Sequence, residues 1–162
     1  RGTSDCSEAG AQQAANSDFI RALNSRSETF ESISYTEVYT KLDEVVTPPR
    51  EAASVGGPGD ITNVAIQDIC PAATAEHLAV GTIDPAAAAL ALDALAHKGP
   101  ADPARIDPLV CLQPVQPGVD PITGPPQVLA ALNNLFIEGG PSGPEPRLRC
   151  YVFKKGCPDK AR

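Results

Sequence analysis

Four Asp-Pro pairs divide the middle of this 162-residue chain into short segments. The pairs begin at Asp84, Asp102, Asp107 and Asp120. An aspartate in this position can accept hydrogen bonds from the free amides of a helix start. Proline has no amide hydrogen and suits the first helical position. Each pair therefore predicts a capped helix start, and the chain is expected to fold as a series of short helices.

Two helices stand out after these signals. Residues 85–97 are closed by Gly99 and Pro100 and carry a single charge, Asp93, in an Ala/Leu-rich interior. We expect most of the circumference of this helix to be buried. Residues 125–137 form a second predicted helix, with apolar positions at helical spacing before a Gly-Gly-Pro end.

The first half of the chain gives weaker signals. Apolar positions recurring at three and four predict a helix within 7–23. Residues 33–40 contain strand-forming side chains, but helical spacing continues to Val45, so we expect a helix there too. The segment 47–59 holds three Pro and three Gly and is predicted to be a flexible, linker-like loop. Asp60 is expected to cap a helix that ends at Cys70.

The composition allows only a thin core. Leu, Ile, Val and Phe together number 36, while Ala occupies 24 positions and buries little area per residue. Cross-links would therefore be a valuable supplement. The five cysteines match no zinc-binding spacing and indicate an oxidising compartment. They are predicted to form two disulfides and to leave one thiol that could join another chain, with the pairing left open among Cys6, Cys70, Cys111, Cys150 and Cys157.

The absence of Met means that Arg1 is not an initiator position, which indicates processing and secretion. No stretch approaches the length of a membrane span. The expected fold is mainly α: a single secreted domain over 1–162, with five or six short helices joined by Pro/Gly loops, a small C-terminal β element and stabilising disulfides.

The C-terminal segment 147–162 differs from the rest. It has a net charge of +5, against −12 for the preceding residues. Alternating apolar and polar positions around Cys150 predict a strand. Aromatic and basic side chains are favoured at binding interfaces, so the predicted contact residues are those at the end of this strand. They are Tyr151, Phe153, Lys154 and Lys155.

The sequence lacks a phosphate-binding loop, a Gly-x-Ser-x-Gly elbow, a His-Glu-x-x-His pair and a dinucleotide fingerprint. The main expectation is a secreted, non-enzymatic protein without a cofactor. It would be a cell-surface, cell-wall or effector-like protein that binds another macromolecule, either a protein or a cell-wall polymer. The acidic body argues against nucleic acid as the partner.

Two alternatives remain open. Short Ala/Leu helices could surround an apolar cavity and carry a lipid or sterol. The chain could instead be a hydrolase with a metal site or a Cys-His site. Candidate metal ligands are His77, Asp93 and His97, and Cys6 is the thiol best placed for a lowered pKa because it precedes a probable helix start. Otherwise, His77 is an ordinary polar-face residue and His97 a helix-terminal one.

Overall fold

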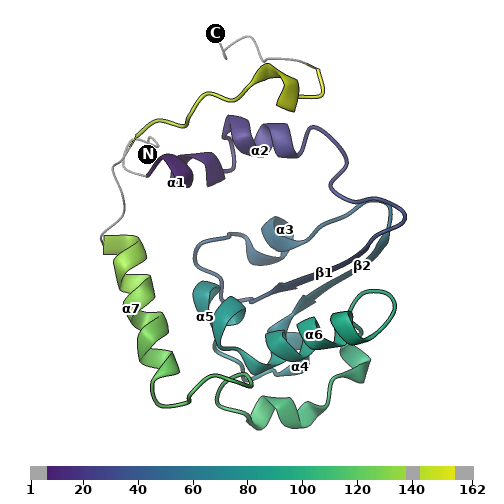
Figure 1. Cartoon of the computed structure of the whole chain (residues 1–162), viewed down its shortest axis with the longest axis vertical. Coiled ribbons are helices and arrows are strands. Elements are labelled where there is room, and N and C mark those ends of the chain that lie inside the picture. The colour runs from purple at the N-terminus through teal and green to yellow at the C-terminus, as the bar shows by residue number, and fades with distance from the viewer. Residues whose placement is uncertain (1–6, 138–142, 156–162) are drawn as a thin grey trace. The chain divides into compact units, whose positions relative to one another are not determined.

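The computed structural model describes residues 7–137 and 143–155 (Figure 1). The chain divides into two compact units. One contains the two ends of the chain, up to Glu28 and from Asn133. The other runs from Thr29 to Leu132.

The unit of the two chain ends contains two short helices, α1 (Glu8–Gln13) and α2 (Asp18–Leu23). The C-terminal segment is joined to the start of α2 by Glu145. Its carboxylate accepts hydrogen bonds from the backbone N–H groups of Asp18 at 2.7 Å and Phe19 at 2.6 Å. A carboxylate is favourable there because a helix start presents unpaired amides and positive dipole charge.

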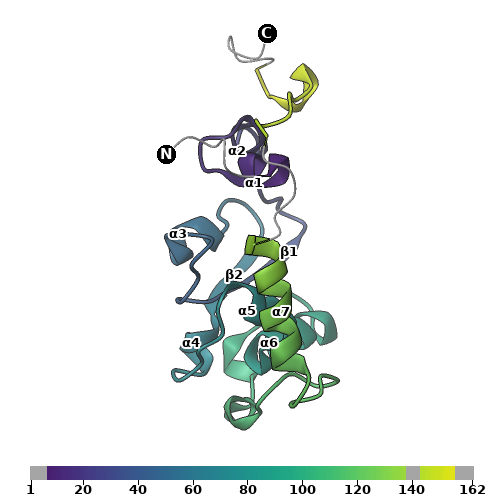
Figure 2. The same cartoon turned by 90° about the vertical axis from the view of Figure 1, so that its left-hand side faces the viewer.

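The larger unit is built on two parallel strands, β1 (Ser34–Tyr39) and β2 (Asp60–Ala65). They pair residue for residue, from Ser34 opposite Asp60 to Tyr39 opposite Ala65. The crossover between them contains α3 (Pro49–Ala53), which lies within the predicted linker-like segment 47–59. Helices α3 and α6 (Pro85–Ala96) lie on opposite sides of the strand pair (Figures 1 and 2).

Further helices follow β2 in the chain. They are α4 (Ile66–Ile69), α5 (His77–Thr82), α6, two 3-10 helices at Pro103–Arg105 and Pro108–Leu112, and α7 (Gly124–Ile137). The predicted caps hold at three sites, where the carboxylates of Asp84, Asp102 and Asp107 accept amide hydrogen bonds at the helix starts. No helix in the described part of the chain has both the length and the apolarity needed to cross a bilayer.

The prediction of a mainly α fold is wrong, because residues 34–39 and 60–65 form strands. Both were expected to be helical. Helical spacing alone does not decide such runs when β-branched and aromatic side chains fill them. Strand pairing also buries Val64 to 3% and Ala65 completely, which a short surface helix capped by Asp60 would not achieve.

The predicted C-terminal β element is also absent from the described residues. Cys150–Val152 forms a 3-10 helix instead. The backbone of this segment is held by polar contacts to the residues after α2. Arg26 donates to the carbonyl of Tyr151 at 3.2 Å, and the N–H of Lys154 donates to Ser25 Oγ at 3.3 Å. These contacts position the segment without strand pairing.

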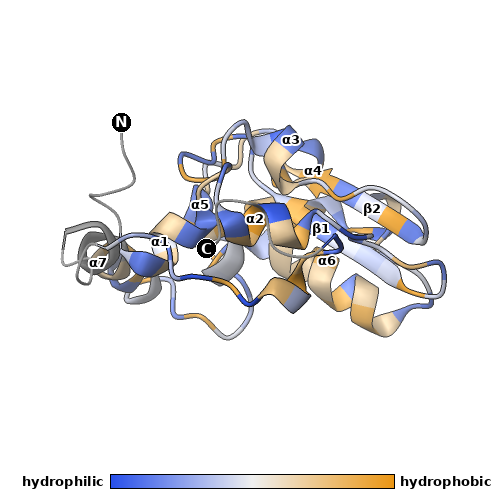
Figure 3. Ribbon diagram, turned by 90° about the horizontal axis from the view of Figure 1, so that it is seen from above, coloured by the Kyte–Doolittle hydropathy of each residue, from blue (hydrophilic) through white to orange (hydrophobic). Residues whose placement is uncertain are grey.

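The core of the larger unit lies between the strands and α6. Val64, Leu90 and Ala101 form one buried cluster, and Ile66 with Ala86 belongs to another. Helix α6 is largely apolar (Figure 3). The sequence predicted that most of its circumference would be buried. That prediction is wrong, because much of the helix surface is exposed or only partly buried.

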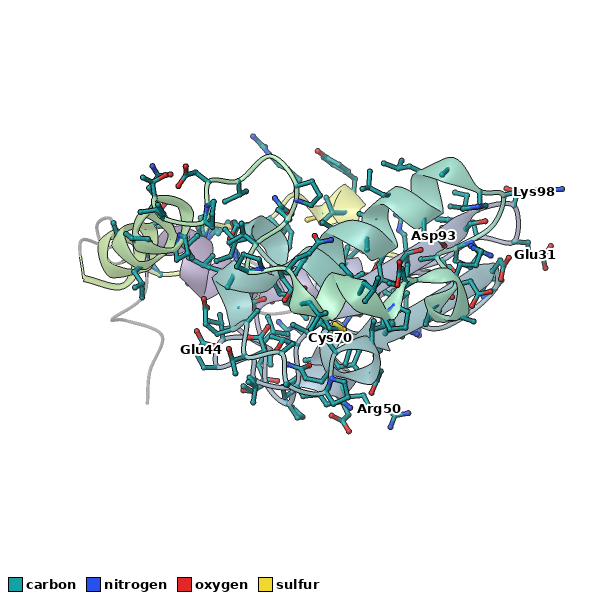
Figure 4. All side chains as sticks on the ribbon, turned by 90° about the horizontal axis from the view of Figure 1, so that it is seen from below. Glu31, Glu44, Arg50, Cys70, Asp93 and Lys98 are labelled. Atoms are coloured by element: carbon teal, nitrogen blue, oxygen red, sulfur yellow. A yellow bond between two sulfur atoms is a disulfide. The ribbon has the colours of Figure 1, made fainter. Side chains whose placement is uncertain are left out.

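The buried face of α6 includes its one charged residue, Asp93, whereas Leu92 and Leu95 are 58% and 84% exposed. Asp93 is buried because its carboxylate is paired. Arg105 donates to it from Nε at 2.8 Å and from Nη2 at 2.6 Å, and the N–H of Asp102 donates at 2.9 Å. In Figure 4, Lys98 extends outwards, whereas Asp93 lies among neighbouring elements. The ion pair therefore fixes the end of α6 to the loop that follows it.

A disulfide joins Cys70, after α4, to Cys111 in the second 3-10 helix (Figure 4). This confirms that the fold is disulfide-bonded. Cys150 is also disulfide-bonded, whereas Cys6 and Cys157 lie outside the described residues. The full pairing scheme remains a prediction.

We expect removal of the Cys70–Cys111 bond to destabilise the chain by about 2–4 kcal/mol, since the bond closes a long loop. The measurement is urea unfolding of the Cys70→Ala/Cys111→Ala double variant beside the wild type. Addition of reductant to both proteins separates the effect of this bond from that of any other disulfide. An unchanged unfolding midpoint in the double variant would contradict the expected role.

The ionised carboxylate of Asp93 should make the thermal stability of the chain depend on pH in the acidic range. The hydrogen bonds from Arg105 and from the Asp102 amide lower the pKa of Asp93 from 3.8 to about 2. A carboxyl with a depressed pKa stabilises the folded state above its unfolded pKa, and this contribution is lost as pH falls. Part of the wild type's thermal stability should therefore disappear between pH 4 and pH 2.

The Asp93→Asn variant should melt at a lower temperature at pH 7 and lose less of its remaining stability over that pH range. Asp102→Asn is the matched control, because Asp102 contacts the same Arg105 at a longer distance of 3.5 Å. Equal melting temperatures of the Asp93→Asn variant and the wild type at pH 7 would show that the pair does not anchor α6.

Candidate active site

The segment after β1 carries Asp43, whose carboxylate is almost fully buried. Its side chain is 7% exposed. Oδ1 accepts hydrogen bonds from the backbone N–H groups of Val45 at 2.9 Å and Val46 at 2.7 Å. Aspartate commonly bonds to the backbone two residues on in tight turns. The two bonds hold the carboxylate in one orientation.

The segment after β2 leads through α4 to His77, the first residue of α5. Glu76 begins this helix by accepting hydrogen bonds from the N–H groups of Leu78 at 2.9 Å and Ala79 at 3.1 Å. Because β1 and β2 are parallel, the segments that follow them leave the same edge of the sheet. Binding and catalytic residues of open α/β sheets gather at this carboxyl edge.

Asp43 and His77 meet there. Nδ1 of His77 lies 2.9 Å from Oδ2 and 3.1 Å from Oδ1 of Asp43. An ionised carboxylate can only accept, so Nδ1 carries the proton in this contact and Nε2 is left as the basic nitrogen. The imidazole is 31% exposed, and Glu44, the residue after Asp43, lies at the surface (Figure 4). Within the pair, the Asp43 carboxylate is therefore buried, whereas the His77 ring is accessible from solvent.

The surroundings keep Asp43 ionised. Burial of the carboxyl raises its pKa, but the hydrogen bonds from the His77 ring and from the Val46 and Val45 amides together outweigh burial and hold the pKa below its usual value. A fixed anion at Nδ1 orients the imidazole and stabilises the imidazolium that forms when Nε2 takes a proton. The arrangement is that of a general base with its orienting acid.

A second Asp-His pair differs from the first in the partners of its carboxylate. His97 lies at the end of α6, 50% exposed, with Nδ1 3.0 Å from Oδ1 of Asp93. The Asp93 carboxylate, however, is already held by Arg105. Its charge is therefore shared with a guanidinium, whereas Asp43 has no Lys or Arg among its described partners.

The structure does not bring the predicted metal ligands together. His77 contacts Asp43, whereas His97 and Asp93 contact each other at the end of α6. Within residues 7–137 and 143–155, no group of three or more His, Cys, Asp or Glu side chains is arranged to hold a metal ion.

The predicted C-terminal contact residues lie in the other unit. Tyr151 is 79% exposed and Lys154 and Lys155 are exposed, whereas Phe153 is buried to 8%. The four therefore do not present one continuous face, and their role in binding remains a prediction.

Asp43 was not predicted as a functional residue, although a signal for it exists in the sequence. It stands three residues after the strand-forming run 33–40, and His77 follows the second strand, 60–65, after a short helix and a loop. Had both runs been assigned to parallel strands, the carboxyl-edge rule would have placed the two side chains together. The helical assignment of 33–45 and 60–69 concealed this.

The fold matches a known enzyme structure. The crystal structure of Aspergillus fumigatus lipase B superposes with a TM-score of 0.73 and 29% sequence identity. The match covers 91% of this chain and 38% of the lipase, which has the α/β-hydrolase fold. No family model and no curated protein matches the chain.

This similarity corrects the expectation of a non-enzymatic protein. The sequence contains no complete catalytic motif of the kinds considered above, such as a nucleophile elbow. The candidate site is instead a contact between residues 34 positions apart, which no local motif reveals. Of the readings left open by the sequence, the hydrolase is the one that the similarity favours.

We expect Asp43→Asn to move the ring proton of His77 from Nδ1 to Nε2, because an amide can donate to Nδ1 and stabilise the wrong tautomer. The ¹⁵N chemical shifts of the two ring nitrogens measure this directly. Asp93→Asn is the matched control and should leave the His77 shifts unchanged. A His77 ring with the same tautomer in the Asp43→Asn variant as in the wild type would rule out the orienting role.

Proposed function

We infer that this chain is part of a secreted, lipase-like ester hydrolase in which His77 is the general base and Asp43 orients it. The observation that carries the proposal is the 2.9 Å contact between His77 Nδ1 and the buried, amide-held Asp43 carboxylate. It is supported by the similarity to a lipase and by the position of both residues after parallel strands.

The order of the two residues fits the proposed class. In α/β hydrolases the triad residues follow one another along the chain as nucleophile, acid and histidine. Asp43 precedes His77, as required. This chain spans 38% of the length of the lipase that it matches, and the proposal assigns the nucleophilic serine to polypeptide before Asp43.

The reaction would proceed in two steps. His77 Nε2 takes the proton of the serine hydroxyl as the oxygen attacks the ester carbonyl, and it then gives that proton to the departing alcohol. Water repeats the sequence on the acyl-enzyme: His77 takes its proton, the hydroxide attacks, and the serine leaves with the proton returned to it. Asp43 remains ionised throughout and stabilises the imidazolium.

The residues around Asp43 suit an apolar substrate. Leu42 and Val45 flank it in the chain and are 51% and 42% exposed. Exposed apolar side chains beside a general base offer a surface for the hydrocarbon part of an ester. We propose secretion because the Cys70–Cys111 disulfide is typical of proteins from an oxidising compartment.

The test uses the native protein from its source, at whatever length the polypeptide has there, with p-nitrophenyl butyrate and octanoate as substrates. Asp43→Asn should lower kcat about 10⁴-fold, as expected when the acid of such a triad becomes an amide. His77→Gln should lower it at least as much. His97→Gln is the matched control, since it alters the other Asp-His pair, and should retain wild-type kcat.

Labelling by a fluorophosphonate probe, followed by peptide mass spectrometry, would identify the serine. It should require His77 and not His97. A native protein that hydrolyses neither ester and takes no label, or one whose activity survives His77→Gln, would overturn the proposal.

A further inference from the structure

Asp43 and His77 belong to separate loops, and one buried hydroxyl connects those loops. Thr40, directly after β1, is completely buried. Its Oγ1 donates a hydrogen bond to the carbonyl of Ala75 at 2.7 Å. Ala75 stands two residues before His77, and Thr40 stands three residues before Asp43.

The same oxygen also accepts two hydrogen bonds. One comes from the N–H of Leu42 at 3.2 Å and the other from Gln67 Nε2 at 2.9 Å. A hydroxyl has one proton and two lone pairs, so the hydrogen-bonding capacity of Thr40 is fully used. Valine, which has nearly the same shape, could make none of these bonds.

Gln67, on α4, extends the connection. Its Oε1 accepts from the N–H of Lys41 at 2.9 Å, and Nε2 also donates to the carbonyl of Ala73 at 3.3 Å. One amide group thus contacts the backbone on both sides: Lys41 in the Asp43 loop and Ala73 in the His77 loop. Next to it on α4, Asp68 forms an ion pair with Lys41 at 2.5 Å.

We propose that Thr40 and Gln67 are positioning residues that set the distance between Asp43 and His77 by hydrogen-bonding the two loops to each other. The proposal rests on the proposed function of the Asp43–His77 pair. The hydrogen bonds made by their side chains go to groups other than Asp43 and His77, and the backbone carbonyl of Thr40 accepts a hydrogen bond from the N–H of Asp43 at 3.4 Å. Both act through backbone groups within four residues of it.

The residues between α4 and α5 have few large side chains to hold them. They run from Cys70 to Glu76 outside any helix or strand and include three alanines. Ala73 and Ala75 pack against the core cluster that contains Ile66, but alanine side chains bury little area each. A displacement of about 1 Å between catalytic groups can cost on the order of 100-fold in rate, so a loop held only by weak packing would not serve.

The first experiment compares Thr40→Val with Thr40→Ser, which keeps the hydroxyl. On this 162-residue chain, the ¹⁵N shifts of His77 report the share of ring proton on Nδ1. Thr40→Val should move part of the proton to Nε2, and Thr40→Ser should restore the wild-type shifts. Identical shifts in Thr40→Val and wild type would overturn the proposal.

Thr36→Val is the matched control for a purely structural effect. Thr36 lies on the same strand, and its Oγ1 accepts from the N–H of Ala101 at 2.9 Å, away from the two loops. This variant should melt at a lower temperature but leave the His77 shifts unchanged. If Thr40→Val fails to fold, Gln67→Met carries the same test, since it removes the amide and preserves the length of the side chain.

The second experiment measures ester hydrolysis by the native protein. Thr40→Val should lower kcat about 10- to 100-fold with little change in KM, and Thr40→Ser should remain near wild type. If kcat is insensitive to Asp43→Asn and His77→Gln, the proposed function fails. If those two variants lose activity while both Thr40→Val and Gln67→Met retain it, only the positioning role fails.

Discussion

The parallel pairing of β1 with β2 is the constraint on which the candidate site depends. It brings the segments after Tyr39 and after Ala65 to one edge, although 26 residues separate the paired positions. A parallel pair also requires a crossover, and here the crossover holds both Asp43 and α3. The hydrogen bonds between the strands thus determine which two loops lie next to each other. The side chains on those loops then determine the chemistry of the candidate site.

The two Asp-His pairs in this chain differ in how the carboxylate is held. In both pairs a buried carboxylate lies about 3 Å from Nδ1. Asp93 also binds Arg105 through two nitrogens, so most of its charge is neutralised by a permanent cation. Asp43 is held by neutral amides, which fix its position without cancelling its charge. Only the second arrangement leaves an anion for an imidazolium to pair with.

The sequence predicted what depends on local hydrogen bonding and missed what depends on distant pairing. The caps at Asp84, Asp102 and Asp107 were predictable because a carboxylate bonds to amides two or three residues away. The strands were not, since helical and strand periodicity overlap in runs of six residues and burial against a distant partner decides between them. With the strands unassigned, the contact between Asp43 and His77 could not be inferred either.

The Ala-rich composition of the chain explains how its site is held. The thin core predicted from 24 alanines is reflected in the loop from Cys70 to Glu76, which has little side-chain area to bury. Besides the packing of Ala73 and Ala75 against the core, that loop is fixed by a covalent bond at Cys70 and by hydrogen bonds that the carbonyls of Ala73 and Ala75 accept. Such bonds act between single atoms and depend on direction, whereas apolar packing does not. A chain with few bulky residues can therefore still hold two side chains of a candidate site accurately, provided that buried polar groups such as Thr40 are fully satisfied.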